Sequence, residues 1–144
     1  MLKKILPLFC VILSIISCGT CSIEVEYYSC GLVPEIDKSC DRGEGADRLY
    51  IHNISGEKIN SVKIIYGEAS FDEADRDAEP DWSEYDNRLE EPIRVDGYSY
   101  CDLDVAESLK TLWVRIDTSD RHCIFAVVYE DGCRIDVNIR KSDT

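Results

Sequence analysis

Short segments in which apolar and polar residues alternate, separated by turn residues at short intervals, make up the chain from Arg48 onwards. Alternation with a period of two places every second side chain on the same face of a β-strand. Strands with one apolar face need a second layer to cover that face. The pattern therefore predicts an all-β fold, a small antiparallel β-sandwich with an immunoglobulin-like architecture.

Several strands can be assigned individually. Residues 48–54 end at the turn pair Ser55-Gly56, and a second strand follows with Ile59 and 62–65 as its apolar positions. In later strands, the residues expected on the inner face are Cys101, Leu103, Val105, Leu112, Val114 and Ile116. The residues expected on the outer face, or beneath a loop, are Asp102, Asp104, Trp113, Arg115 and Asp117.

Asp131-Gly132 is the strongest local turn signal, because this pair favours a two-residue hairpin. With those residues as the loop, Val128 pairs with Ile135, Ala126 with Val137 and Ile124 with Ile139 on one apolar face. The opposite face carries Phe125, Val127 and Tyr129, placed across from Arg134, Asp136 and Asn138. We expect a loop or the N-terminal leader to cover that face in part.

The chain carries a spaced set of residues: Asn53, Ser55, Gly56, Ile59, Asp81-Trp82, Leu89, Gly97 and Arg115. This set resembles small β-sandwich proteins common among bacterial exported proteins and lipoproteins. The family pattern has glycine after the tryptophan, where this chain has Ser83. The resemblance implies the sandwich fold over about residues 48–139 and no catalytic residues. Asn53-Ile54-Ser55 also matches a glycosylation sequon, which is interpreted as coincidental beside a turn.

The N-terminus has the layout of a signal peptide. Lys3 and Lys4 precede the segment 5–16, which is apolar apart from Pro7, Cys10 and Ser14. A membrane-spanning helix needs about 20 apolar residues, so this segment is too short for a permanent anchor. We predict that residues 1–17 are a signal peptide that is cleaved.

The order Ile15, Ile16, Ser17, Cys18 resembles the lipobox of bacterial lipoproteins. The resemblance implies that Cys18 carries a thioether-linked diacylglycerol and an N-acyl chain, and several acyl chains give stable membrane anchoring. The alternative is an ordinary secretory signal cleaved near Ser17 or Gly19, which leaves Cys18 or Cys21 for disulfides.

Six of the eight cysteines remain when Cys10 in the signal and Cys18 at the anchor are set aside. The disulfide candidates are Cys21, Cys30, Cys40, Cys101, Cys123 and Cys133, because an even set in an exported chain indicates disulfides. Strand parity excludes a Cys123–Cys133 bridge and favours Cys101 with Cys133. Cys123 is then expected to hold a leader cysteine. We expect three regions: the signal 1–17, a lipidated, cysteine-rich leader 18–47 with one strand, and the sandwich 48–144.

Residues 68–91 form an acidic segment with eleven carboxylates and two arginines. Oxygen ligands concentrated in a loop suit calcium, and the candidate donors are Asp72, Asp75, Asp77 and Asp81. The alternating pattern of an EF-hand loop is absent, so a solvated acidic loop is the preferred interpretation. Trp82 and Tyr85 are expected to pack over the sheet edge or to form an exposed recognition tip.

Charge and motifs narrow the class of function. The net charge is -13, and removal of Lys3 and Lys4 with the signal changes it to -15, which disfavours nucleic acid as a partner. No motif indicates a catalytic residue, a cofactor or a glycine-rich phosphate loop. We expect a non-enzymatic binding or structural protein, lipid-anchored in the bacterial cell envelope, with a protein partner in the envelope or a host. The alternative is a freely secreted, disulfide-stabilised effector or binding protein.

Overall fold

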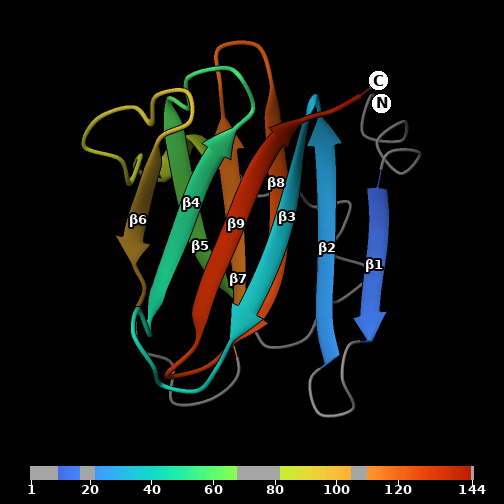
Figure 1. Ribbon diagram of the computed structural model, residues 1–144, viewed down its shortest axis with the longest axis vertical. Coiled ribbons are helices and arrows are strands. Elements are labelled where there is room, and N and C mark those ends of the chain that lie inside the picture. The colour runs from blue at the N-terminus through green and yellow to red at the C-terminus, as the bar shows by residue number, and fades with distance from the viewer. Residues whose placement is uncertain (1–9, 17–21, 68–81, 105–109, 144) are drawn as a thin grey trace.

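Two β-sheets packed face to face form the protein (Figure 1). The computed structural model describes residues 10–16, 22–67, 82–104 and 110–143. The expectation of an all-β chain is confirmed, since these residues form strands, turns and a single 3-10 turn, η4 (Trp82–Glu84). The described residues contain no helix that is long and apolar enough to cross a membrane.

The five-stranded sheet is antiparallel throughout and has the order β1-β2-β8-β7-β5. Its strands are β1 (Cys10–Ile16), β2 (Ser22–Cys30), β5 (Ser61–Gly67), β7 (Lys110–Asp117) and β8 (His122–Tyr129). The predicted inner face of β7 is confirmed, because Leu112, Val114 and Ile116 are fully buried.

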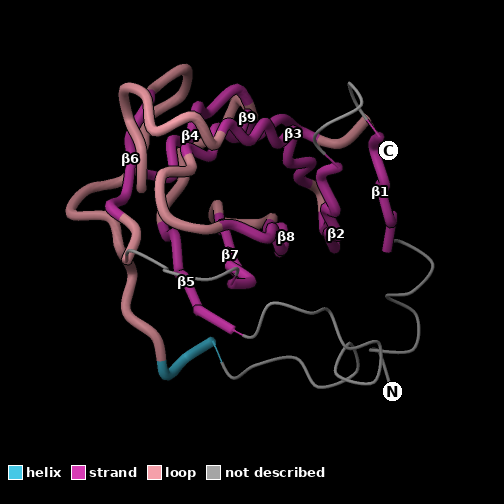
Figure 2. Tube along the Cα trace, turned by 90° about the horizontal axis from the view of Figure 1, so that it is seen from below, coloured by secondary structure: helices cyan, strands magenta, loops and turns pink. Residues whose placement is uncertain are grey.

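The four-stranded sheet has the order β3-β9-β4-β6 and covers the other side of the core (Figure 2). Its strands are β3 (Leu32–Ser39), β4 (Arg48–Ile54), β6 (Tyr98–Asp102) and β9 (Arg134–Lys141). β3 and β6 run antiparallel to their neighbours, whereas β4 and β9 run parallel. The prediction of an antiparallel sandwich is therefore wrong at this one pair, whose strands are separated in the chain by β5 to β8.

The predicted hairpin at Asp131-Gly132 is wrong. β8 pairs with β2 and β7, whereas β9 pairs with β3 and β4, so the chain crosses from one sheet to the other at this turn. Phe125, Val127 and Tyr129, expected outside, lie in the core together with Ile135 and other β9 residues. Both strands have an apolar face, and these faces meet across the sandwich instead of side by side in one sheet.

The segment predicted to be a leader with one strand forms two. β2 joins the five-stranded sheet and β3 the four-stranded sheet, linked through Gly31 at a φ of 91°, a left-handed conformation that glycine adopts without strain. Strands from both sides of the expected boundary at residue 48 therefore lie in the same sheets. The processing of residues 1–17, which include β1, stays a prediction.

Asn53 ties together the connections at one end of the sandwich. Its side chain is fully buried, and its amide nitrogen donates hydrogen bonds to the carbonyl oxygens of Glu57, Ile93 and Arg94. Its amide oxygen accepts from both the backbone and the hydroxyl of Ser55. The side-chain amide of Asn53 is thus engaged inside the fold, so Asn53 and Ser55 have structural roles here.

We predict that Asn53→Ala lowers the free energy of unfolding by about 2 to 4 kcal/mol, because several buried carbonyl groups lose their donor. Asn138→Ala is the matched control, since Asn138 is exposed on β9, and it is expected to change stability by less than about 0.5 kcal/mol. Urea unfolding measures both variants. Equal stability of the two would show that the Asn53 bonds do not hold the loops.

Candidate functional site

The outer face of the four-stranded sheet carries the most distinctive group of exposed side chains in the described part of the chain. Register places three positions of β4 directly beside three of β6, in the pairs Arg48 with Asp102, Tyr50 with Tyr100, and His52 with Tyr98. β9 lies on the other side of β4 and contributes Arg134, Asp136 and Asn138. We call the set Arg48, Tyr50, His52, Tyr98, Tyr100, Asp102 and Arg134 the tyrosine face.

The three tyrosine rings of this face lie in contact. The Tyr50 ring centroid is 5.7 Å from that of Tyr98 and 5.4 Å from that of Tyr100, distances typical of aromatic pairs. Tyr50 is nearly buried at 8% exposure, whereas Tyr98 and Tyr100 are 58% and 46% exposed. Tyr50 therefore supports two large rings that remain open to solvent.

Two arginines stack on these rings. The guanidinium carbon of Arg48 lies 4.4 Å from the Tyr100 centroid, and that of Arg134 lies 4.0 Å from the Tyr50 centroid. Each arginine also has a carboxylate partner on the sheet, at 3.2 Å between Arg48 and Asp102 and 2.9 Å between Arg134 and Asp136. The paired arginines hold their neighbouring rings in place on a rigid sheet.

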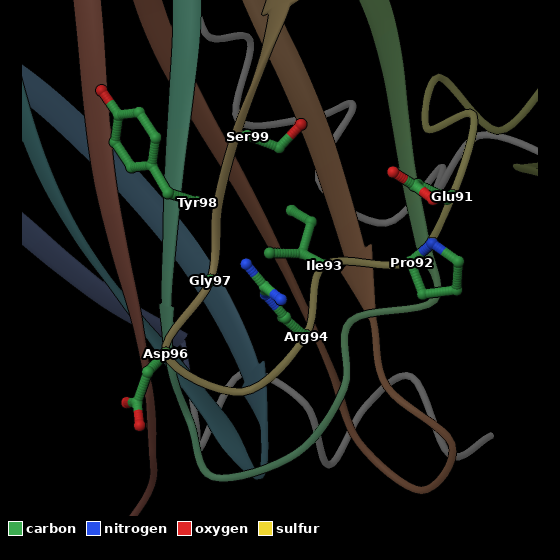
Figure 3. A pocket seen from close by; sticks show the side chains of 8 residues that line it. All are labelled: Glu91, Pro92, Ile93, Arg94, Asp96, Gly97, Tyr98 and Ser99. Carbon is green, nitrogen blue, oxygen red and sulfur yellow. The ribbon is translucent and has the colours of Figure 1, made fainter.

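A hollow of about 550 Å³ adjoins the tyrosine face (Figure 3). It is lined by residues 91–94 and 96–99, the turn that leads into β6. A backbone bond from Gly97 to Arg94 closes this turn, and a further pair of backbone bonds joins Asn53 to Asp96 and Gly97. Tyr98 is common to the lining of the hollow and to the tyrosine face.

The predicted cysteine pairing is corrected by the structure. Cys40 forms a disulfide with Cys133, and Cys30, Cys101 and Cys123 are free. The proposed Cys101–Cys133 bridge is therefore wrong, and so is the expectation that Cys123 holds the leader. β3 pairs with β9 up to Ser39 and Arg134, so the next step of the same register places Cys40 opposite Cys133.

Burial makes two of the free thiols poor nucleophiles. Cys123 is fully buried and Cys101 is 5% exposed, and burial raises the pKa of both thiols above the usual range. Cys30 is exposed. The hydroxyl of Tyr129 donates to the carbonyl oxygen of Asp104, and burial raises the pKa of this phenol.

The remaining predicted site residues lie outside the described residues. They are Cys18, Cys21, Asp72, Asp75, Asp77 and Asp81. Within the described ranges, no group of three or more histidine, cysteine or acidic side chains is placed to hold a metal ion. Trp82 is buried, as expected for packing over the sheet, and Tyr85 is 39% exposed.

Sequence reasoning missed the tyrosine face. The signal was present in 98–102, where two tyrosines and an aspartate alternate with inward residues on a half-buried strand. Large aromatic residues at outward positions of a strand are a mark of recognition surfaces. No family model, curated protein or solved structure matches the chain, so the site rests on its own geometry.

We predict that non-reducing peptide mapping yields a Cys40–Cys133 peptide. Brief alkylation of the native protein should modify Cys30 and leave Cys101 and Cys123 unmodified until the chain is unfolded. Reduction is expected to lower the free energy of unfolding by about 2 to 5 kcal/mol, because the bridge closes a long loop. A Cys101–Cys133 peptide, or native labelling of Cys123, would contradict the structure.

Proposed function

We propose that this protein is a lipid-anchored component of the bacterial cell envelope, in which the β-sandwich serves as a non-enzymatic binding module. The observation that carries the binding role is the tyrosine face. Tyr98 and Tyr100 are large exposed rings at fixed positions on a sheet, and tyrosine and arginine are the residues most enriched at binding hot spots. The tyrosine face needs no ordering before a partner binds, since its rings are held by neighbouring strands.

The location in the envelope is supported by the sequence. The order from Ile15 to Cys18 follows a basic start and a short apolar segment, as in lipoprotein signals. The Cys40–Cys133 disulfide fits an oxidising compartment outside the cytoplasm. The same disulfide fits the rival proposal of a freely secreted effector, so the acyl chains decide between the two.

The strand order supports an orientation for the anchored protein. Cys18 precedes the start of β2 by four residues, which span at most about 14 Å. β2 starts beside the end of β8, at the end of the sandwich where β9 begins and the disulfide lies. β6 starts at the other end (Figure 1), and the register places Tyr98 at that start, opposite His52. An anchor at Cys18 would leave the tyrosine face accessible above the membrane.

The finer architecture belongs to the same proposal. We expect the sandwich to be immunoglobulin-like, which is supported by two packed sheets and by connections that cross between them. The proposal assigns no catalytic residue, and burial of Cys101 and Cys123 in the core disfavours these two thiols as nucleophiles. The acidic segment 68–91 is expected to act as a solvated loop, and calcium binding there is the less favoured alternative.

We predict that the protein expressed in a bacterial host partitions into detergent and has a mature N-terminus at Cys18 with the mass of added acyl chains. Cys18→Ser should abolish both the acyl mass and the partitioning. Cys30→Ser is the matched control, because it removes an exposed thiol outside the lipobox, and it should leave both unchanged. A water-soluble native product without acyl chains would refute the anchor and favour the secreted effector.

A further inference from the structure

β6 is an edge strand whose outward backbone groups include those of the two exposed tyrosines. The backbone N–H of Asn53 donates to the carbonyl of Gly97, and the backbone N–H of Leu103 donates to the carbonyl of Asp47. In the β4·β6 pair, Asn53 with Gly97 and Asp47 with Leu103 are therefore hydrogen-bonded positions. Hydrogen-bonded and non-bonded positions alternate along an antiparallel pair. Tyr98, Tyr100 and Asp102 therefore direct their backbone N–H and C=O away from β4.

At two other edges of the sandwich, some backbone groups are occupied or missing. Along β5, the side chain of Asn87 accepts from the backbone of Val62 and donates to that of Asn60, and the amide of Arg88 donates to the Val62 carbonyl. β3 carries Pro34, which has no N–H and is a common protection of an edge strand.

At β6, the carbonyl of Asp102 accepts from Arg88. No other described residue bonds to the outward backbone of Tyr98 or Tyr100. Among the described residues, this edge is therefore open at the tyrosines.

The tyrosine face repeats one contact from strand to strand. Arg134 of β9 stacks on Tyr50 of β4, and Arg48 of β4 stacks on Tyr100 of β6. In both contacts the arginine lies on the strand farther from the β6 edge, and Tyr98 carries no guanidinium from the described residues. A strand added at the open edge would place its side chains opposite Tyr98 and Tyr100.

The charge around β6 favours a basic occupant. The segment 82–104 contains seven acidic residues and two arginines, and Asp102 is 77% exposed at the end of β6. An extended basic segment would meet the exposed carboxylate of Asp102 as well as two aromatic rings.

We propose that an extended peptide segment of a partner protein, with arginine or lysine at every second residue, adds to β6 as an antiparallel fifth strand. Its main chain bonds to the outward N–H and C=O groups of Tyr98 and Tyr100, and its alternate cationic side chains stack on their rings. The inference rests on the binding role proposed above and names the chemistry and the mode of the partner.

The probe for this proposal is a capped seven-residue peptide of alternating threonine and arginine, titrated against the full chain purified in detergent. In an antiparallel addition with arginines opposite Tyr98 and Tyr100, the arginine N–H groups point towards β6 and the threonine N–H groups point away. N-methylation of the arginines should weaken binding by about tenfold or more, whereas N-methylation of the threonines should change it by less than about threefold.

Charge and aromatic contacts are tested with matched controls. A peptide with glutamate in place of arginine should not bind. Tyr98→Ser combined with Tyr100→Ser should weaken binding of the arginine peptide by about tenfold or more. Tyr85→Ser, which removes an exposed tyrosine outside the sheet, should leave binding unchanged.

Absence of saturable binding by the arginine peptide, or equal effects of the two N-methylated peptides, would overturn the proposal. The peptide series leaves the protein unaltered, so it remains decisive even if the double variant does not fold. An acylated protein that fails to bind the peptide would refute the strand addition and leave the lipid anchor intact. A soluble protein without acyl chains that binds the peptide would refute the lipid anchor and support the strand addition.

Discussion

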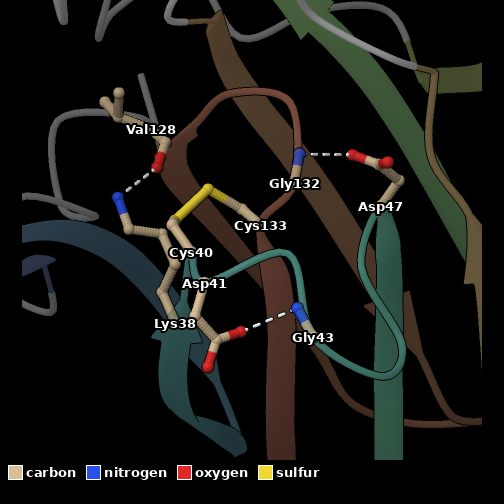
Figure 4. The surroundings of a disulfide bond; sticks show 8 residues. All are labelled: Lys38, Cys40, Asp41, Gly43, Asp47, Val128, Gly132 and Cys133. Carbon is tan, nitrogen blue, oxygen red and sulfur yellow. Dashed lines mark hydrogen bonds between the residues drawn. A yellow bond between two sulfur atoms is a disulfide. The ribbon is translucent and has the colours of Figure 1, made fainter.

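The crossing of the chain from β8 to β9 determines the arrangement of the rest of the fold. The Cys40–Cys133 disulfide and the bond from the Gly132 amide to the Asp47 carboxylate hold this crossing (Figure 4). Further contacts are the bond from the Asp47 amide to the Cys133 carbonyl, the bond from the Arg42 amide to the Gly132 carbonyl, and the ion pair of Arg42 with Asp131. Lys38 adds a bond from β3 to the carbonyl of Val128 on β8, so both sheets are joined at this end. With the crossing held, β9 lies between β3 and β4, and β4 in turn carries β6 at the edge of its sheet.

The strands and most of their faces could be predicted from the sequence because both depend on local alternation. Leu112 and Leu103 are buried where the pattern places them, and Asp102 and Asp104 are exposed. The partners of the strands could not be predicted in this way. Phe125 and Ile135 belong to two apolar faces that fit either one hairpin or two facing sheets, and the choice depends on β2, β3 and β4, which are distant in sequence.

The same limit explains the cysteines and the tyrosine face. Cys40 meets Cys133 only because β3 pairs with β9, which no local signal reveals. Tyr50 and Tyr100 are far apart in the chain and touch because β4 pairs with β6. Alternation identified the polar side of these strands, whereas the combination of stacked arginines, supported rings and an open edge depends on three strands lying side by side.

Amide hydrogen exchange along β6, followed residue by residue by NMR, tests the open edge most directly. The amides of Ser99 and Cys101 face β4 and should be protected by the sheet, whereas those of Tyr98 and Tyr100 face outward and should exchange at least about a hundredfold faster. Alternation of fast and slow exchange would support a free edge ready to accept a strand. Equal protection of all four amides would show that the edge is already covered, and it would contradict the role assigned to the tyrosine face.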